Sequence, residues 1–214
     1  MATAHVQDGS VVGVTLENVD SFLLIGDATV TTASLGPMQV DIAYGGDFYA
    51  IVDADSIGLD LSPADEAAAA AVAGEIITAV NEQLPVAHPD NPSINRCYET
   101  MFTTGAVLSG DVRHVVVSPP GAFDRSPCGT GSSARLATMY ARKQVAVGQR
   151  VRFEGLLGTY LTGEIGSVRE HAGRIVVRPR ITGRAYLTGF HTFVLDRDDP
   201  FPMGYRIGPT ARPQ

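Results

Sequence analysis

The segment Cys128-Gly129-Thr130-Gly131 places a thiol and two glycines where a helix is expected to begin. Unpaired backbone N–H groups converge at a helix N-terminus, and the helix dipole adds positive potential there. The glycines let a carboxylate or phosphate approach the backbone, and the same field favours a thiolate over a thiol. A reactive thiolate at Cys128 beside an anion-binding loop suits chemistry on a small carboxylic acid.

Asp124 lies four residues before Cys128 and is suited to face a substrate ammonium group. Together with the anion-binding loop, it would hold an amino acid by both of its charged ends. Two simpler interpretations stay open, with Asp124 as a turn or cap residue and Cys128 as a small core residue. Cys97 lies inside a strand-like run, and we expect it to be buried and structural.

A rival interpretation is a dinucleotide-binding fingerprint. Gly129 to Ala134 fits G-x-G-x-x-A, and Glu154 follows at the end of an expected strand. Against it, the preceding strand is expected to end near Ser118, and no alternating βαβ pattern is visible. The five histidines are scattered without helical pairing, so their spacing does not predict a metal site.

The first half of the chain reads as strands and tight turns. Asp8-Gly9 between β-favouring residues predicts a hairpin, and Gly45-Gly46 marks a turn or a close backbone approach. The 23 glycines predict frequent turns and short strands, with β-rich segments continuing to about Leu195. The expected strands are Val11–Glu17, Phe22–Ile25, Ala28–Thr32, Met38–Tyr44, Phe48–Asp53, Arg96–Thr103 and Asp111–Ser118.

Two helices are expected. The first has Ser62 as N-cap, Pro63 in the first turn and Asp65 as the acidic partner of a capping box, and Pro85 ends it. Its apolar residues recur at helical spacing, which indicates an amphipathic surface helix. The second, about Gly131 to Lys143, is apolar nearly all round and therefore buried. Its only polar stripe is Arg135, Thr138 and Arg142.

These elements predict an α+β fold in which short antiparallel strands wrap a central buried helix, with one amphipathic helix at the surface. The formal charge of −7 excludes a general nucleic-acid-binding surface. The longest small-apolar run, Ala67–Ala73, is far short of the ~20 residues that cross a bilayer. Because no signal peptide is visible either, we expect a cytoplasmic protein with no membrane partner.

The segment Asp124-Arg-Ser-Pro-Cys-Gly-Thr-Gly-Ser-Ser-Ala134 resembles the proline racemase and hydroxyproline epimerase family. Tyr44–Asp53 upstream supports the resemblance, as do downstream Gly183-Arg-Ala-Tyr, Gly189-Phe-His-Thr-Phe and Asp199-Pro-Phe-Pro-Met-Gly204. It implies two similar halves of the diaminopimelate epimerase type, each with a sheet around a central helix and the active site between them.

The same resemblance implies inversion at the Cα of 4-hydroxyproline or proline without a cofactor, by two cysteines acting as base and acid on opposite faces. Cys128 matches one of them. Gly129 and Thr130 match the backbone groups that hold the substrate carboxylate, and Asp124 matches the residue near the ring nitrogen. A dehydratase branch has threonine in place of this cysteine, so Cys128 favours a racemase or epimerase.

One family motif has no counterpart here. The first cysteine segment, similar to Cys-Gly-His-Gly, is absent, and Cys97 in Asn95-Arg-Cys-Tyr-Glu does not resemble it. We therefore expect residues 1–214 to be one β-rich domain equivalent to the second half, truncated, with about 184–214 crossing to the other half. Such a half would expose the face that normally packs against the other half. Exposed apolar surface of this kind is usually covered by another subunit, so we predict a homodimer. The alternative function is a catalytically incomplete binding module or remnant without the partner cysteine.

Overall fold

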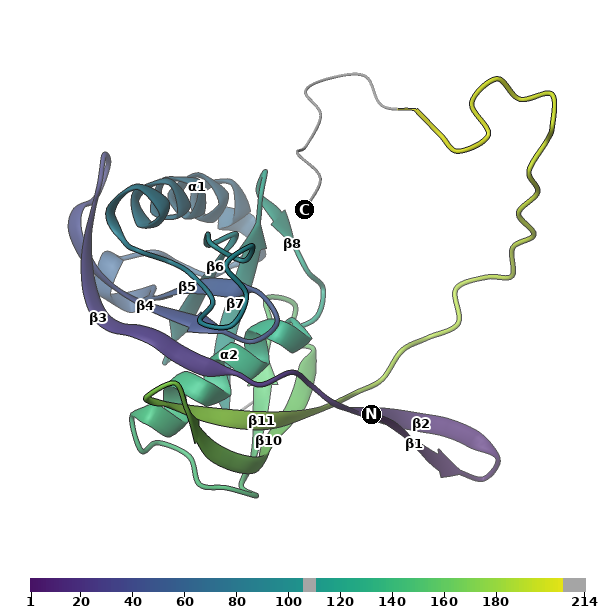
Figure 1. The fold of residues 1–214 in the computed structure, drawn as a ribbon, viewed down its shortest axis with the longest axis horizontal. Helices are drawn as coiled ribbons and strands as arrows, with labels where there is room; N and C mark the ends of the chain where they lie inside the picture. Colours follow the sequence, from purple (N-terminus) through teal and green to yellow (C-terminus); the bar gives the residue numbers. More distant parts are fainter. Residues whose placement is uncertain (106–110, 206–214) are drawn as a thin grey trace. The chain divides into compact units, whose positions relative to one another are not determined.

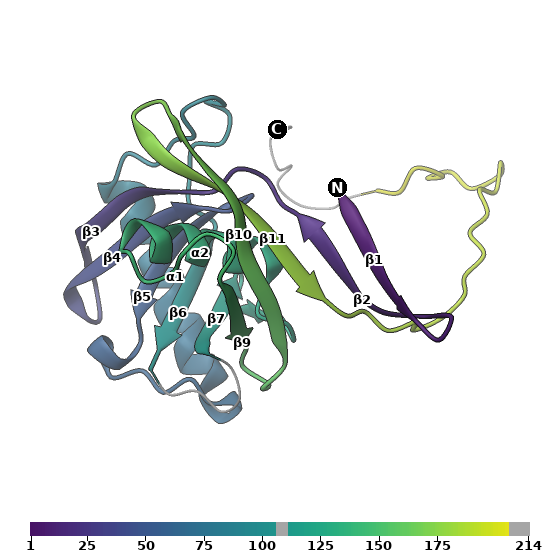
Figure 2. The ribbon, with the colours of Figure 1, turned by 90° about the horizontal axis from the view of Figure 1, so that it is seen from below.

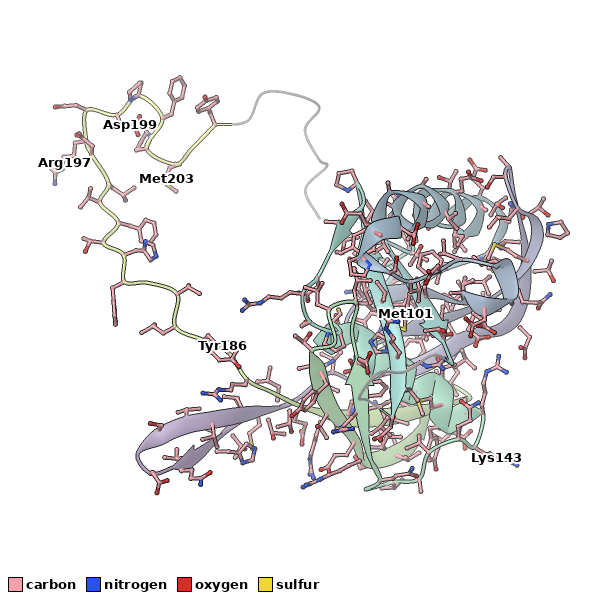
Figure 3. All side chains as sticks on the ribbon, turned by 180° about the vertical axis from the view of Figure 1, so that it is seen from behind. Met101, Lys143, Tyr186, Arg197, Asp199 and Met203 are labelled. Carbon is pink, nitrogen blue, oxygen red and sulfur yellow. The ribbon has the colours of Figure 1, made fainter. Side chains whose placement is uncertain are left out.

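The computed structural model describes residues 1–105 and 111–205. The chain divides into two compact units, Met1–Arg184 and Ala185–Gln214 (Figure 1). All the helices and strands of the described residues lie in the first unit. The described part of the second unit, residues 185–205, has neither strand nor helix, and its side chains are exposed (Figure 3).

The first unit is built on one large sheet. Its strands follow the order β1-β2-β11-β10-β9-β7-β6-β5-β4-β3, and β8 pairs with β7. The strand bounds are β1 Ala2–Gln7, β2 Ser10–Glu17, β3 Phe22–Thr32, β4 Gly36–Tyr44, β5 Phe48–Asp53, β6 Glu99–Thr104, β7 Val112–Ser118, β8 Ala122–Phe123, β9 Arg150–Glu154, β10 Tyr160–His171 and β11 Arg174–Gly183.

The sheet closes on itself just before β3. Ser21 and Val177 exchange two backbone hydrogen bonds of 2.9 Å, which join the start of β3 to β11. The expected hairpin is present, because β1 and β2 pair around Asp8 and Gly9, both with positive φ. The α+β class is therefore confirmed.

Strand direction and strand length differ from expectation. Among the described strands, the pairs β5/β6 and β7/β9 are parallel, and each is connected through a helix. The expectation of antiparallel strands holds for the other pairs and was wrong for these two, and the expectation that no βαβ unit occurs was wrong. Strands β3, β10 and β11 have 11, 12 and 10 residues, because several glycines lie inside strands rather than between them. At Gly163 in β10, an added Cβ would lie 2.7 Å from the Phe153 ring. The last strand ends at Gly183, not near Leu195.

Helix α1, Glu66–Gln83, packs against β3, β5, β6 and β7 and buries one face: Ala69, Ala73, Ile76, Ala79 and Val80. A 3₁₀ turn, Pro63–Asp65, precedes it. The predicted capping box is not formed, because Ser62 Oγ donates to the Asp65 carboxylate at 2.5 Å instead of accepting a backbone N–H. The surface helix is present, but its α-helical part begins three residues later than expected.

Helix α2, Gly129–Ala141, runs between β3–β5 on one side and β10–β11 on the other (Figure 2). Eight of its thirteen residues are buried. Thr138, expected in the polar stripe, is one of them, and its hydroxyl donates to the Ala134 carbonyl at 3.1 Å. In the described parts of the chain, neither helix has the length and apolar character that crossing a membrane requires.

Candidate active site

Cys128 is the N-cap of α2. Its Sγ accepts a hydrogen bond from the Gly131 N–H at 3.4 Å, so the thiol lies directly over the first turn. Its backbone has φ 67° and ψ 122°, a conformation that a residue with a Cβ rarely adopts and that costs about 1–3 kcal/mol. Because α2 has no acidic residue in its first turn, its N–H groups have no carboxylate of their own there.

Tyr49 on β5 also reaches this thiol. Its hydroxyl lies 2.6 Å from Thr130 Oγ1 and 3.4 Å from Cys128 Sγ, and Thr130 Oγ1 is itself 3.4 Å from the sulfur. The sequence pattern predicts a strand around Tyr49 but assigns this residue no role. The available signal was strand alternation, because Tyr49 and Ile51 both pack in the small cluster that includes Ala134 and Cys128.

The start of α2 lies very close to the β4–β5 turn. An added Cβ on Gly45 would lie 2.5 Å from the Ala134 N and closer still to the Thr130 carbonyl oxygen, so only glycine fits. Asn18 links the β4–β5 turn to α2, because its side-chain amide donates to the Gly45 carbonyl and to Ser133 Oγ, both at 2.8 Å. The close approach expected at Gly45-Gly46 is therefore present, and it determines where Thr130 lies.

Two hydrogen bonds hold the loop that leads to Cys128, one from a buried histidine and one to a serine of the loop itself. His114 on β7 is fully buried, and its Nε2 donates to the Pro127 carbonyl at 2.6 Å. Burial lowers the pKa of His114 to about 4, so the ring is neutral at pH 7. Ser126 Oγ accepts the Cys128 N–H at 3.1 Å. These bonds fix the residue on each side of the Pro127–Cys128 peptide.

The predicted site residues divide into two groups. Cys128, Gly129 and Thr130 lie together at the start of α2, and a Cβ on Gly129 would meet no described atom within 4 Å, so a ligand has room there. Asp124 is exposed, and its carboxylate accepts the Ser126 N–H at 3.0 Å and the Ser126 hydroxyl at 2.7 Å. In this structure, Asp124 therefore makes the contacts of a turn residue.

Two half-buried carboxyl groups lie near Tyr49. Glu99 on β6 is its partner in the parallel register, and Asp47 belongs to the β4–β5 turn. Burial raises the pKa of both carboxyl groups, and each raises the pKa of Cys97 by its charge. One Glu99 oxygen, Oε2, is buried without a hydrogen-bond partner among the described residues. Sequence reasoning missed both groups.

The other residues that the sequence singled out lie outside this site. Cys97 is buried, its Sγ lies 3.2 Å from the Phe48 carbonyl oxygen, and burial raises its pKa to about 12. Glu154, the acidic residue of the rival fingerprint, is fully buried and lies 3.6 Å from Arg113 Nε, so it is not available to a ribose hydroxyl. Across residues 1–105 and 111–205, no three His, Cys, Asp or Glu side chains gather as a metal site.

Comparison with known proteins adds independent findings. The sequence model of the family described as proline racemase matches residues 1–206. A 4-hydroxyproline 2-epimerase of Streptosporangium roseum is 38% identical over 207 residues, covering 97% of this chain and 62% of that protein. The chain thus spans about three fifths of the length of the curated relatives it matches.

Two solved structures are similar in both fold and sequence. A probable proline racemase from Agrobacterium radiobacter K84, with bound carbonate, has a TM-score of 0.85 and 35% identity over 96% of this chain and 60% of its own. A hydroxyproline epimerase from Agrobacterium vitis, with bound trans-4-hydroxy-L-proline, has a TM-score of 0.82 and 38% identity over 89% of this chain and 55% of its own.

Proposed function

Because this chain belongs to the proline racemase family, we propose that it supplies one side of an active site that inverts the Cα of 4-hydroxyproline or proline without a cofactor. The observation that carries the proposal is the Cys128 thiol over an α2 first turn that has no acidic side chain. A related epimerase structure holds trans-4-hydroxy-L-proline, which agrees with this substrate class.

Cys128 acts as the base on one face of the substrate. Its thiolate takes the proton from Cα, and the electron pair left behind is delocalised into the substrate carboxylate. Helix geometry leaves the N–H groups of Gly129 and Thr130 without intrahelical acceptors, and we assign them to that carboxylate. Charge that builds up on the carboxylate oxygens is then stabilised by donors already in place.

Asp124 is assigned to the ring nitrogen. Its carboxylate sits on an exposed loop whose next residues lead directly to the Cys128 cap. The two hydrogen bonds from Ser126 hold it in a fixed orientation and leave further lone pairs free, since a carboxylate accepts about four hydrogen bonds. In this role Asp124 pairs with the ammonium group while the helix start binds the carboxylate.

Inversion also needs a proton donor on the opposite face. Cys97 is unsuited, because it is buried and bonded to backbone carbonyls. We place the second thiol in the part of the relatives that this chain does not match. The first unit is then the equivalent of a second half, with β-strands around α2, and residues 185–205 cross to the other half. Residues 206–214 of that segment lie outside the described residues.

The exposed apolar side chains of residues 185–205 support an assembly role. Phe190 and Phe193 are 90% and 91% exposed, and seven other large apolar residues of this segment are also exposed. Apolar surface of this kind is normally covered by a partner. We propose a homodimer when the matching half is not supplied.

Chiral chromatography of trans-4-hydroxy-L-proline tests the proposed function. When the half that carries the second thiol is supplied, we expect loss of the L-isomer, and we expect Cys128→Ser to lower that rate by about 10³-fold. Cys97→Ala is the control and should keep the activity. An undiminished rate in Cys128→Ser would overturn the assigned role.

Proton exchange in D₂O separates one-sided from two-sided chemistry. A single thiol exchanges the α-proton for deuterium without inverting Cα, whereas two thiols give exchange together with inversion. Exchange without inversion would support the placement of the second thiol outside this chain.

A second candidate is a binding module, favoured by the single accessible thiol of the chain. It predicts neither inversion nor exchange, and at most weak binding of pyrrole-2-carboxylate, a planar mimic of the deprotonated ring. Calorimetry that shows tight binding to this chain argues against it.

A further inference from the structure

Tyr49, Thr130 and Cys128 form a closed triangle of polar groups. The three sides are the Tyr49 Oη–Thr130 Oγ1 distance of 2.6 Å and the two 3.4 Å distances from these oxygens to Cys128 Sγ. The three groups come from β5 and from the start of α2, which are 79 residues apart in the chain. The Gly131 N–H also donates to the sulfur, at 3.4 Å.

Counting hydrogens shows which form of the sulfur this triangle favours. The two hydroxyls carry one hydrogen each, so one can donate to the sulfur while the other donates to its neighbouring hydroxyl. With the Gly131 N–H, a thiolate then accepts two hydrogen bonds from the protein. Hydrogen bonds to an ionised acceptor are roughly twice as strong as those between neutral groups. The arrangement therefore stabilises the thiolate more than the thiol.

Tyr49 is a dependable donor in this triangle. Burial raises its pKa well above the ordinary value of 10.0, and the charge of Cys128 raises it further. Tyr49 is 2% exposed, so its hydroxyl is held mainly by protein groups. The phenol thus keeps its proton throughout the pH range in which a cysteine ionises.

The neighbouring charged groups differ in sign. Glu99 faces Tyr49 from β6, and Asp47 lies on the β4–β5 turn. Both are acidic and oppose a nearby negative charge. Behind the thiol, from β7, His114 is neutral at pH 7 and bonded to the Pro127 carbonyl. Arg135, further along α2, lowers the pKa of His114 by its charge. The groups that contact the sulfur itself are the two hydroxyls and the Gly131 N–H at the helix start.

We propose that Tyr49 is a positioning residue of the active site, whose hydroxyl acts with that of Thr130 to hold Cys128 as the thiolate. This inference rests on the proposed role of Cys128 as the base. Its test uses no substrate, however, so failure of the epimerase proposal and failure of this inference give different results.

The experiment measures how fast iodoacetamide alkylates Cys128 in the whole chain. Trypsin cuts after Arg125 and Arg135, so mass spectrometry of peptide 126–135 reports Cys128 separately from Cys97. We expect Tyr49→Phe to slow alkylation about tenfold at pH 7. At about pH 10.5, where a free thiol is ionised in any case, we expect the two rates to coincide.

Further variants show whether the two hydroxyls act together. Thr130→Val should slow alkylation at pH 7 to a similar extent, Thr130→Ser should restore the rate, and the double variant should fall by less than the product of the single effects. Tyr140→Phe is the matched control on α2 and should leave the rate unchanged. Equal rates for Tyr49→Phe and the natural chain at pH 7 would overturn the inference, and so would an equal slowing at both pH values.

Discussion

The two helices of this fold begin in opposite ways. Helix α1 starts on an exposed 3₁₀ turn and carries its own carboxylate, Glu66, in the first turn. Helix α2 starts at a thiol in a strained conformation, without an acidic residue, against the backbone of the β4–β5 turn. Both helix starts have the same positive potential and the same unpaired N–H groups. Only α2 has no acidic side chain of its own in the first turn to interact with these groups.

The two helix starts also differ in how closely the rest of the fold surrounds them, and we propose a catalytic role only for the start of α2. The loop before α1 should tolerate many substitutions, because its cap residues lie at the surface. At α2, contacts from β4–β5, β7 and Asn18 fix the position of a few atoms around Cys128. Changes at α2 should therefore cost more than equivalent changes at α1, and three predictions test this difference.

The largest effect is expected from a single methyl group. Gly45→Ala would place a Cβ against the Thr130 carbonyl oxygen and the Ala134 N, backbone atoms that cannot move aside cheaply. We expect a loss of about 3 kcal/mol in the free energy of unfolding, measured by denaturant titration. Gly74→Ala in α1 is the matched control, since its Cβ would meet no described atom within 4 Å, and we expect a gain of up to about 1 kcal/mol. Equal effects would remove the distinction between the two helix starts.

Acid should act on the α2 start through His114. The folded-state pKa of about 4 lies below the ordinary value of 6.5, so between these values the unfolded chain binds a proton that the folded chain does not. Stability from this group is complete above pH 6.5 and falls by roughly 3 kcal/mol as the pH drops to 4.

Unfolding free energies at pH 7 and pH 4 measure this loss. The difference should be about 3 kcal/mol smaller in His114→Gln, whose amide can still donate to Pro127. Asp47 and Glu99, with raised pKa values, contribute with the opposite sign, and comparing the two proteins cancels them. An unchanged difference in His114→Gln contradicts the prediction.

The smallest effect compares two serines. Ser126→Ala removes the acceptor of the Cys128 N–H and a donor to Asp124, and we expect a loss of about 1 kcal/mol. Ser62→Ala at α1 removes only an exposed bond to Asp65, and we expect a few tenths of a kcal/mol. Thermal melting of both variants checks the order. A larger loss for Ser62→Ala would mean that α1, not α2, depends on its cap.

Local signals in the sequence predicted local structure well. The Asp8-Gly9 hairpin, the strand Phe48–Asp53 and the end of α1 before Pro85 are present as expected, because turn residues and periodicity act over a few positions. Parallel pairing of β5 with β6 was missed, since it depends on how α1 crosses from one strand to the next. The prediction of Ser62 as an N-cap was wrong, because its hydroxyl donates to the Asp65 carboxylate instead of accepting a backbone N–H.

The site was predictable only in part. Cys128 and its glycines form a motif that can be recognised within four residues of sequence. Tyr49, in contrast, contacts the thiol from a strand that is far away in sequence. A tyrosine in a strand is usually a core residue, so nothing local distinguishes it. The fixed position of Thr130 likewise depends on Gly45, which the sequence marked as a close approach without showing to what. Roles of this kind depend on tertiary contacts.

The two backbone hydrogen bonds between Ser21 and Val177 can form only late in the synthesis of the chain. A ribosome releases the chain from its N-terminus, so β3 is synthesised long before the strand that completes the closed sheet. Joining distant residues also costs loop entropy before any contact compensates for it. Until Val177 has left the ribosome, the sheet stays open at Ser21, and α2 is covered by β3–β5 on one side while β11 is still missing from the other. The nascent protein is therefore most exposed to aggregation during synthesis, when chaperones would matter most.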